Sequence, residues 1–325
     1  MKKKFWRRGA AAVAVLAAFA AATAACARPA TNTAAANTAG ERVRISVGVD
    51  PSYAPFFLAD REGLFKAAGL DVQIIQTEGG AAGAQNVVAG TSEMSGNANS
   101  TALTVMAGNP KLRALGVYEE SDRYFQVVLR DGVTPNSIKT MGVFPGIGLY
   151  FTDLYLRSLG LDPASIALVT TSPPEQPALL ARGDIDGFIS FDPWITQAVG
   201  KGSHVVGTTG NFGAKYSQWL VASDSWLSGH QELAGRVFRV LAQAADIVAS
   251  DPDRAGKAVA AAIQMDPIEA RKQVTQIDFK GRDFTADDLD QARRLVDFFR
   301  GQGKINGDID PQKVLLSGWF NQNAK

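Results

Sequence analysis

The sequence predicts an α/β protein with two β/α runs followed by a helical block, and three observations support this fold class. The 325 residues are 46% hydrophobic and 20% charged, which is typical of globular proteins. A chain of this length is expected to form two cores rather than one. From Val43 onward, strand-like and helix-like patterns alternate, as they do in proteins with a mainly parallel sheet.

The N-terminus has the three parts of a secretory signal: the basic "MKKKFWRR", the apolar run Ala10–Ala25, and a small-residue cleavage region. A transmembrane anchor is the alternative, but this run of 16 residues is shorter than the roughly 20 that a spanning helix needs. We therefore expect residues 1–25 to be a signal peptide and the protein to be exported.

Cys26 is the only cysteine, so it cannot form an internal disulfide and is either a free thiol or modified. "TAAC" (23–26) resembles the bacterial lipobox, in which the cysteine is lipidated, although Thr23 stands where that motif usually has leucine. Lipidation is favoured over simple secretion. Residues 26–41 are small and polar without periodicity and indicate a flexible tether. The expected location is lipid-anchored, at the outer face of the cytoplasmic membrane or in the periplasm.

The net charge argues against a nucleic-acid partner. The formal value is +1, but five basic residues lie before Cys26. Without them, Lys and Arg fall from 33 to 28 against 32 acidic residues, which gives −4. A mildly acidic exported protein lacks the basic surface that binds nucleic acid.

The first β/α run extends from Val43 to Glu120. Its expected strands are residues 43–49, 70–77, 93–99 and 112–120, and its expected helices are residues 54–69, 81–90 and 101–108.

The second run extends from Tyr124 to Gly210. Its expected strands are residues 124–130, 141–144, 166–172, 187–191 and 204–210, and its expected helices are residues 148–160, 175–184 and 193–202.

The chain after residue 227 is expected to be helical. The clearest helices are residues 230–250 and 285–303, the second with apolar residues on one face. Thr285 and Asp288 resemble a capping box, and Gly301 is a suitable helix stop. These helices need a sheet to cover, and we expect it to be that of the first run.

The chain contains, in this order, "YAPFFLADREGLFKAAGLDVQIIQTEGG" (53–80), "VVAGTSEMSGNANSTAL" (87–103) and "LLARGDIDGFISFDPW" (179–194). Their order and spacing resemble the solute-binding proteins of ABC importers for nitrate, taurine, alkanesulfonates and thiamine-precursor pyrimidines, over about residues 42–228. The resemblance implies a type II periplasmic-binding-protein fold, in which two extended crossovers join two lobes around a ligand.

The same resemblance implies where the lobes divide. Lobe one would comprise residues 42–122 plus 220–325, and lobe two residues 123–219. The crossovers would lie near residues 120–130 and 218–223, with the C-terminal helices returning to lobe one.

In open α/β sheets, ligands bind beyond the carboxyl ends of strands, so we expect the binding residues in strand-to-helix turns. After the first strand, Tyr53 offers a ring face and a hydroxyl, while Phe56 and Phe57 are expected to be core. Asn97 follows the third strand and offers donors and acceptors to a polar ligand. The alternative for Asn97 is helix capping.

The turn "SFDPW" (190–194) is a third candidate. Asp192 and Pro193 suit a helix start, but an Asp192 carboxylate that faces the ligand would pair with an amine or ring N–H. Trp194 would then form an apolar or cation–π wall. Trp219, on the second expected crossover, is a further candidate.

The turn "FPGIGLY" (144–150) is the fourth. Around Gly146, Ile147 and Gly148, a glycine-rich helix start exposes backbone N–H groups that suit an anion such as sulfonate, nitrate or carboxylate. Relatives that bind sulfonate or nitrate usually have serine or threonine here. Because this chain has Ile147 and Gly148 instead, the sequence does not identify which anion would bind.

An enzyme is not expected. His204 and His230 have no metal-ligand spacing, and no "GxSxG" elbow occurs. The fold family also contains a pyrimidine-synthesising enzyme and a porphyrin-pathway deaminase, whose histidine-rich or cysteine chemistry this chain lacks. A carboxylate-only active site stays open as an alternative. A DNA-binding regulator would need an N-terminal helix-turn-helix, which is absent.

The predicted function is capture of a small solute for an ABC permease whose ATPase is a separate subunit. The protein is expected to act as a monomer, without metal or cofactor, and to touch the membrane only through its lipid anchor. An interaction or sensor lipoprotein on the same fold is the alternative. The ligand stays open among sulfonate, taurine, nitrate and pyrimidine, although apolar Ile147 favours a ligand larger than nitrate. Asp192 suggests a zwitterion or a nitrogen-bearing ring.

Overall fold

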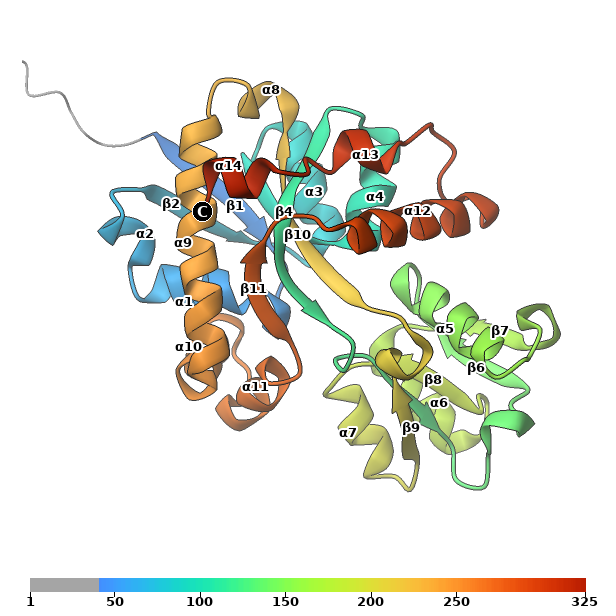
Figure 1. Cartoon of the computed structure of the whole chain (residues 1–325). Coiled ribbons are helices and arrows are strands. Elements are labelled where there is room, and N and C mark those ends of the chain that lie inside the picture. Colours follow the sequence, from blue (N-terminus) through green and yellow to red (C-terminus); the bar gives the residue numbers. More distant parts are fainter. Residues whose placement is uncertain (1–40) are drawn as a thin grey trace, which may run out of the picture. The chain divides into compact units, whose positions relative to one another are not determined.

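The computed structural model describes residues 41–325 (Figure 1). The predicted signal peptide, the predicted lipidation site Cys26 and residues 26–40 of the predicted tether therefore lie outside the described residues. The described part contains a six-stranded and a five-stranded sheet, each with helices packed against it (Figure 1). We call the six-stranded sheet with its helices lobe one, and the five-stranded sheet with its helices lobe two.

The sheet of lobe one has the strand order β11-β4-β10-β3-β1-β2. Its strands are β1 (Arg42–Val47), β2 (Asp71–Gln76), β3 (Met94–Ala98), β4 (Leu112–Ser121), β10 (Tyr216–Ser223) and β11 (Asp278–Arg282). β1 pairs in parallel with β2 and β3, whereas β10 runs antiparallel to both β3 and β4, and β11 antiparallel to β4. The sheet is therefore mixed rather than mainly parallel, because a returning strand lies at its centre.

The sheet of lobe two has the strand order β7-β6-β8-β5-β9. Its strands are β5 (Gln126–Leu129), β6 (Thr140–Val143), β7 (Ala167–Thr170), β8 (Gly187–Ser190) and β9 (His204–Thr208). β6 is parallel to β7 and β8, while β5 is antiparallel to β8 and β9. The carboxyl ends of β6 and β8 therefore lie side by side.

Two crossovers connect the sheets. The first leads from β4 to β5 through residues 122–125, inside the expected span. The second leads from β9 to β10 through residues 209–215, earlier than the expected 218–223. It is earlier because Tyr216–Ser223 pair with β4 over their whole length, which also places residues 216–219 in the sheet of lobe one rather than in lobe two.

The helices follow the expected alternation. In lobe one they are α1 (Ala54–Arg61), α2 (Leu64–Ala67), α3 (Gly80–Ala89), α4 (Asn99–Gly108), α8 (Asp224–Leu227), α9 (Gln231–Ser250), α10 (Pro252–Ile263), α11 (Pro267–Val274), α12 (Ala286–Gly301), α13 (Pro311–Val314) and α14 (Trp319–Asn323). In lobe two they are α5 (Ile147–Ser158), α6 (Gln176–Arg182) and α7 (Trp194–Val199). The 3₁₀ turns are η1 (Pro51–Tyr53), η2 (Pro135–Ser137), η3 (Pro163–Ser165), η4 (Pro173–Glu175) and η5 (Thr209–Phe212).

The C-terminal helices cover lobe one, as expected. α9 packs on β11 and α1, and α12 packs on α4 (Figure 1). The capping box of Thr285 and Asp288 is present, and α12 ends at Gly301. The expectation that everything after residue 227 is helical is wrong for β11, a short strand that pairs Phe279 with Glu119 at the sheet edge.

Among residues 41–325, none of the helices has the length and apolar character that a membrane crossing requires. The membrane contact that the sequence predicts belongs entirely to the N-terminal residues outside this range.

Gly235 makes the packing of the C-terminal segment on α9 possible. A Cβ atom at this position would overlap the backbone carbonyl of Asn323, close to the end of α14. We expect Gly235→Ala to lower the free energy of unfolding by about 1–3 kcal/mol, because a backbone contact cannot yield as a side chain can.

Urea unfolding measures the effect, with Gly301→Ala as the matched control. Gly301 is the last residue of α12, and a Cβ there meets nothing within 4 Å. Equal stability of the two variants would contradict the packing role of Gly235.

Candidate ligand-binding site

The turn between β6 and α5 offers free backbone donors. α5 begins at Ile147, and its N-cap, Gly146, has φ 81° and ψ −126°, with no side chain capping the helix. Among the described residues, no acceptor bonds the N–H groups of Ile147 or Gly148. A helix start in this state presents partial positive charge and unsatisfied donors, which attract an anion.

Gly148 is needed for packing as well. A Cβ at this position would lie 2.7 Å from Cδ1 of Phe144, so only glycine lets the Phe144 ring lie against the helix start. Two different constraints thus favour glycine in this turn. Gly146 has a positive φ, and the aromatic ring of Phe144 approaches Gly148 closely.

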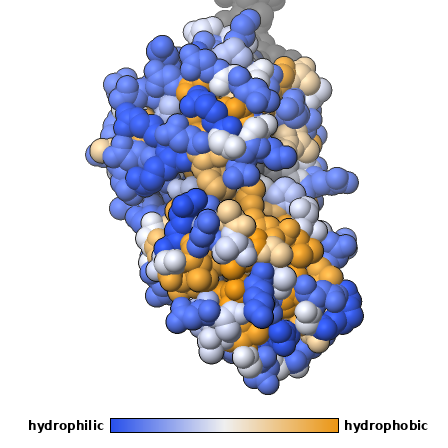
Figure 2. Space-filling model, turned by 90° about the vertical axis from the view of Figure 1, so that its right-hand side faces the viewer, coloured by the Kyte–Doolittle hydropathy of each residue, from blue (hydrophilic) through white to orange (hydrophobic). Residues whose placement is uncertain are grey.

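A pocket of about 440 Å³ lies at this turn. Lobe two contributes Val143, Phe144, Pro145, Gly146, Leu149 and Thr170, and lobe one contributes Thr104, Phe299 and Lys304. Most of these side chains are apolar, and Lys304 is the cation among them. In Figure 2, hydrophobic residues gather on the lower part of the molecule, which is lobe two, whereas the upper part is mostly hydrophilic.

The turn after β8 is the immediate neighbour of the turn after β6, because the two strands pair in parallel. The ring centroids of Phe144 and Phe191, one from each turn, are 6.4 Å apart. Asp192 follows Phe191, so the turn that carries Asp192 adjoins the turn at the start of α5.

Both oxygens of the Asp192 carboxylate already have partners within the protein. Its Oδ1 accepts from the backbone N–H of Thr196 at 2.9 Å and from the Thr196 hydroxyl at 2.7 Å. Its Oδ2 lies 2.7 Å from Nζ of Lys272, which belongs to α11 of lobe one. Burial raises the pKa of Asp192, but the hydrogen bonds from Lys272 and Thr196 outweigh it, so the pKa is lowered and the group is charged.

The two tryptophans differ in position. Trp194 is half-buried at the start of α7, beside Asp192. Trp219 lies inside β10 rather than on a crossover, is 1% exposed, and donates its indole N–H to Ser217 at 3.1 Å. It also packs edge-on against Phe284, so the sequence-based expectation for Trp219 does not agree with its burial in the sheet.

Tyr53 and Asn97 lie together at the strand ends of lobe one. A Cβ on Gly80 would be 3.1 Å from Nδ2 of Asn97 and 3.4 Å from the Tyr53 hydroxyl, so both side chains meet at the start of α3. Asn97 is fully buried, accepts from Ser95 and donates to the carbonyl of Gly80. It does not cap α4, the alternative considered from the sequence; it fixes the turn before α3.

Glu119 is a buried acid that the sequence did not single out. It is 0% exposed, and both carboxyl oxygens lack a hydrogen-bond partner. Gln218 lies directly opposite on β10, but its amide group is committed to Ser52, Tyr118 and Tyr216. Burial raises the pKa of Glu119 well above its ordinary value, and the charges of Asp50, Glu120 and Asp278 add to the rise.

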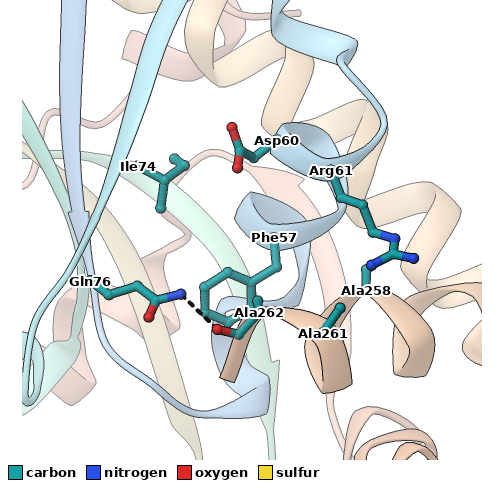
Figure 3. A pocket seen from close by; sticks show the side chains of 8 residues that line it. All are labelled: Phe57, Asp60, Arg61, Ile74, Gln76, Ala258, Ala261 and Ala262. Carbon is teal, nitrogen blue, oxygen red and sulfur yellow. Dashed lines mark hydrogen bonds between the residues drawn. The ribbon is translucent and has the colours of Figure 1, made fainter. Parts of the chain in front are cut away.

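A second pocket, of about 460 Å³, lies on lobe one between α1, β2 and α10 (Figure 3). Phe57, Ile74 and three alanines form most of its wall, and Gln76 donates to the carbonyl of Ala262 at 3.0 Å (Figure 3). None of the predicted binding residues lines it, and its Asp60 and Arg61 are exposed. The candidate site is therefore the pair of turns in lobe two with the facing residues of lobe one.

The candidate site includes residues without a sequence signal. Lys272, Lys304 and Thr104 come from helices or loops of lobe one that only the fold brings to the turns of lobe two. Within residues 41–325, no three His, Cys, Asp or Glu side chains are grouped so that they could hold a metal ion.

Two α/β lobes, joined by two crossovers and trailed by helices that return to lobe one, define the class of two-lobed periplasmic-binding-protein folds. A model described as the NMT1-like family matches residues 38–264, and the chain belongs to this family. No curated protein matches the chain in sequence.

Solved structures share the fold at low identity. The periplasmic aliphatic sulphonate binding protein SsuA from Escherichia coli is 13% identical with a TM-score of 0.77, covering 87% of this chain and 99% of that one. The alkanesulfonate-binding protein SsuA from Xanthomonas axonopodis pv. citri, bound to MOPS, is 14% identical with a TM-score of 0.70, covering 84% and 97%. The periplasmic nitrate-binding protein NrtA from Synechocystis PCC 6803 is 12% identical with a TM-score of 0.68, covering 86% and 87%.

We expect Glu119→Gln to stabilise the protein at neutral pH. The folded state raises the pKa of Glu119, so the wild-type protein loses stability relative to the variant as the pH rises above the ordinary value of 4.5. The loss is about 1.4 kcal/mol for each pH unit up to the folded-state pKa.

Thermal unfolding at pH 4 and pH 7.5 measures this difference. The variant should gain stability over wild type only at the higher pH. A variant that is less stable than wild type at pH 7.5 would contradict the absence of a partner for Glu119.

Proposed function

We propose that this chain is an extracytoplasmic solute-binding protein that captures a small organic anion of the sulfonate class and delivers it to an ABC permease. Export, lipid anchoring at Cys26 and a separate ATPase subunit are parts of this proposal. It is supported by family membership, by the fold shared with sulfonate- and nitrate-binding proteins, and by the geometry of the β6–α5 turn.

The observation that supports an anionic solute is the uncapped start of α5. The Ile147 and Gly148 N–H groups have no acceptor among the described residues, and Gly146 places no side chain over them. Lys304 adds a positive charge to the pocket that Gly146 and Leu149 line at this helix start. Hydrogen bonds to a charged group are about twice as strong as neutral ones, so these donors favour a sulfonate or carboxylate oxygen over a carbonyl.

The pocket walls favour an organic rather than an inorganic anion. Phe144, Leu149 and Phe299 line the pocket at the start of α5. Burying a methylene group against such a wall contributes about 0.8 kcal/mol. An alkyl or aryl sulfonate gains this contribution, whereas nitrate does not.

The remaining predicted contacts belong to the same proposal. Tyr53 and Asn97 would approach the solute from the strand ends of lobe one, and Trp194 from α7 of lobe two. Solute contacts from both lobes would favour the arrangement in which the lobes are close, because a ligand shifts a conformational equilibrium only by its differential affinity.

A thermal-shift panel tests the function. We expect straight-chain sulfonates from methane- to hexanesulfonate to raise the melting temperature, with the effect growing with chain length, and nitrate to have little effect. If neither sulfonates nor any other small anion stabilises the protein, the proposed function is wrong.

Ile147→Pro tests the donor directly. Ile147 is the first residue of α5, a position where proline fits a helix while lacking the N–H. We expect sulfonate affinity to fall about tenfold or more, from the loss of one hydrogen bond to a charged group.

The control for Ile147→Pro is Ile147→Val, which trims the same buried side chain and keeps the N–H. Calorimetric titration of both variants gives the comparison. Equal losses in the two variants would assign the effect to packing and remove the backbone donor from the site.

A further inference from the structure

Asp192 has an amine partner inside the protein. The Lys272 ammonium lies 2.7 Å from Oδ2 of Asp192 and 2.8 Å from the hydroxyl of Thr196. Both Thr196 bonds go to Oδ1. The Asp192 side chain is only 2% exposed. Each oxygen of Asp192 therefore already has a partner within the protein, and an amine that arrives from solution would have to compete with Lys272 for Oδ2.

The pair also spans the two lobes. Lys272 lies on α11 of lobe one, and Asp192 on the β8–α7 turn of lobe two. The Lys272 side chain is 46% exposed, whereas the Asp192 side chain is only 2% exposed. The Lys272 ammonium therefore competes with any solute amine for Asp192. Because it is attached to the protein by a short flexible side chain, its effective concentration is on the order of millimolar.

The position of the pair decides which solutes fit. The Asp192 turn adjoins the turn that offers the anion donors, as the Phe144–Phe191 contact shows. A short aminosulfonate with its anionic end at Ile147 and Gly148 would bring its ammonium toward Asp192. It would meet the Lys272 ammonium there, and like charges in a partly buried site repel each other.

We propose that Lys272 is a specificity-determining residue, which occupies Asp192 and thereby selects sulfonates without an amino group over aminosulfonates. This inference rests on the proposed function and names the class of solute within it. Without the Lys272 charge, the buried Asp192 carboxylate keeps only its two bonds from Thr196. The ammonium group of a solute can then take the place of Lys272 at Oδ2.

The experiment compares two solutes that differ by one ammonium group, ethanesulfonate and taurine. Calorimetric titrations at pH 7 give both affinities for the wild-type protein, for Lys272→Met and for Lys272→Gln, which keeps a donor but not the charge. Lys280→Met is the matched control, since Lys280 is an exposed lysine of lobe one with no ion pair to any described residue.

We expect the wild-type protein to favour ethanesulfonate, and Lys272→Met to shift the affinity ratio at least tenfold toward taurine. Lys272→Gln should shift it in the same direction by less, and Lys280→Met not at all. A ratio that is unchanged in both Lys272 variants, or a wild-type protein that already favours taurine, overturns this inference and leaves the proposed function intact. Failure of every protein to bind either solute overturns both.

Discussion

The antiparallel insertion of β10 between β3 and β4 is the constraint on which the rest of the structure depends. β10 returns from lobe two and pairs along its length with β4, so both crossovers leave the sheet of lobe one at the same end. The carboxyl ends of β1 and β3 lie at that end as well. Tyr53 and Asn97 therefore lie at the end of the sheet from which the connections to lobe two leave.

Aromatic packing reinforces the crossovers. Tyr124 of the first crossover stacks on Phe191 at 5.4 Å, and Phe125 meets Tyr216, the first residue of β10, at 5.1 Å. Phe191 precedes Asp192, so the rings that fix the crossovers also fix the carboxylate turn. The Asp192–Lys272 pair adds a directional contact between the lobes, because ion pairs across an interface set register more than they add affinity.

The sequence predicts the order of elements well and the contacts between them poorly. Alternation of strand and helix patterns, together with the three family-like stretches, is local information, and it placed the β6–α5 and β8–α7 turns correctly. The sequence does not predict β11, because "DFKGR" buries little besides Phe279 and owes its extended form to pairing with β4. Lys272 has no local signal at all, since a lysine on a polar helix is ordinary. From the sequence alone, Glu119 resembles an exposed acid on a strand. Only the structure shows that it is buried and that the amide of the facing Gln218 bonds to other residues. The sequence predicts Trp219 on a crossover rather than inside β10, because strand ends cannot be located from sequence to within a few residues.

Trp194 gives the protein a built-in optical reporter. It is half-buried and lies two residues after Asp192, whereas Trp219 and Trp319 are enclosed in lobe one. Indole emission depends on local polarity and on nearby charge, so changes at the junction between the lobes should alter the spectrum of Trp194 more than that of the enclosed tryptophans. If the chain binds a solute as proposed, the intrinsic fluorescence of Trp194 would report that binding on the unlabelled chain, in real time.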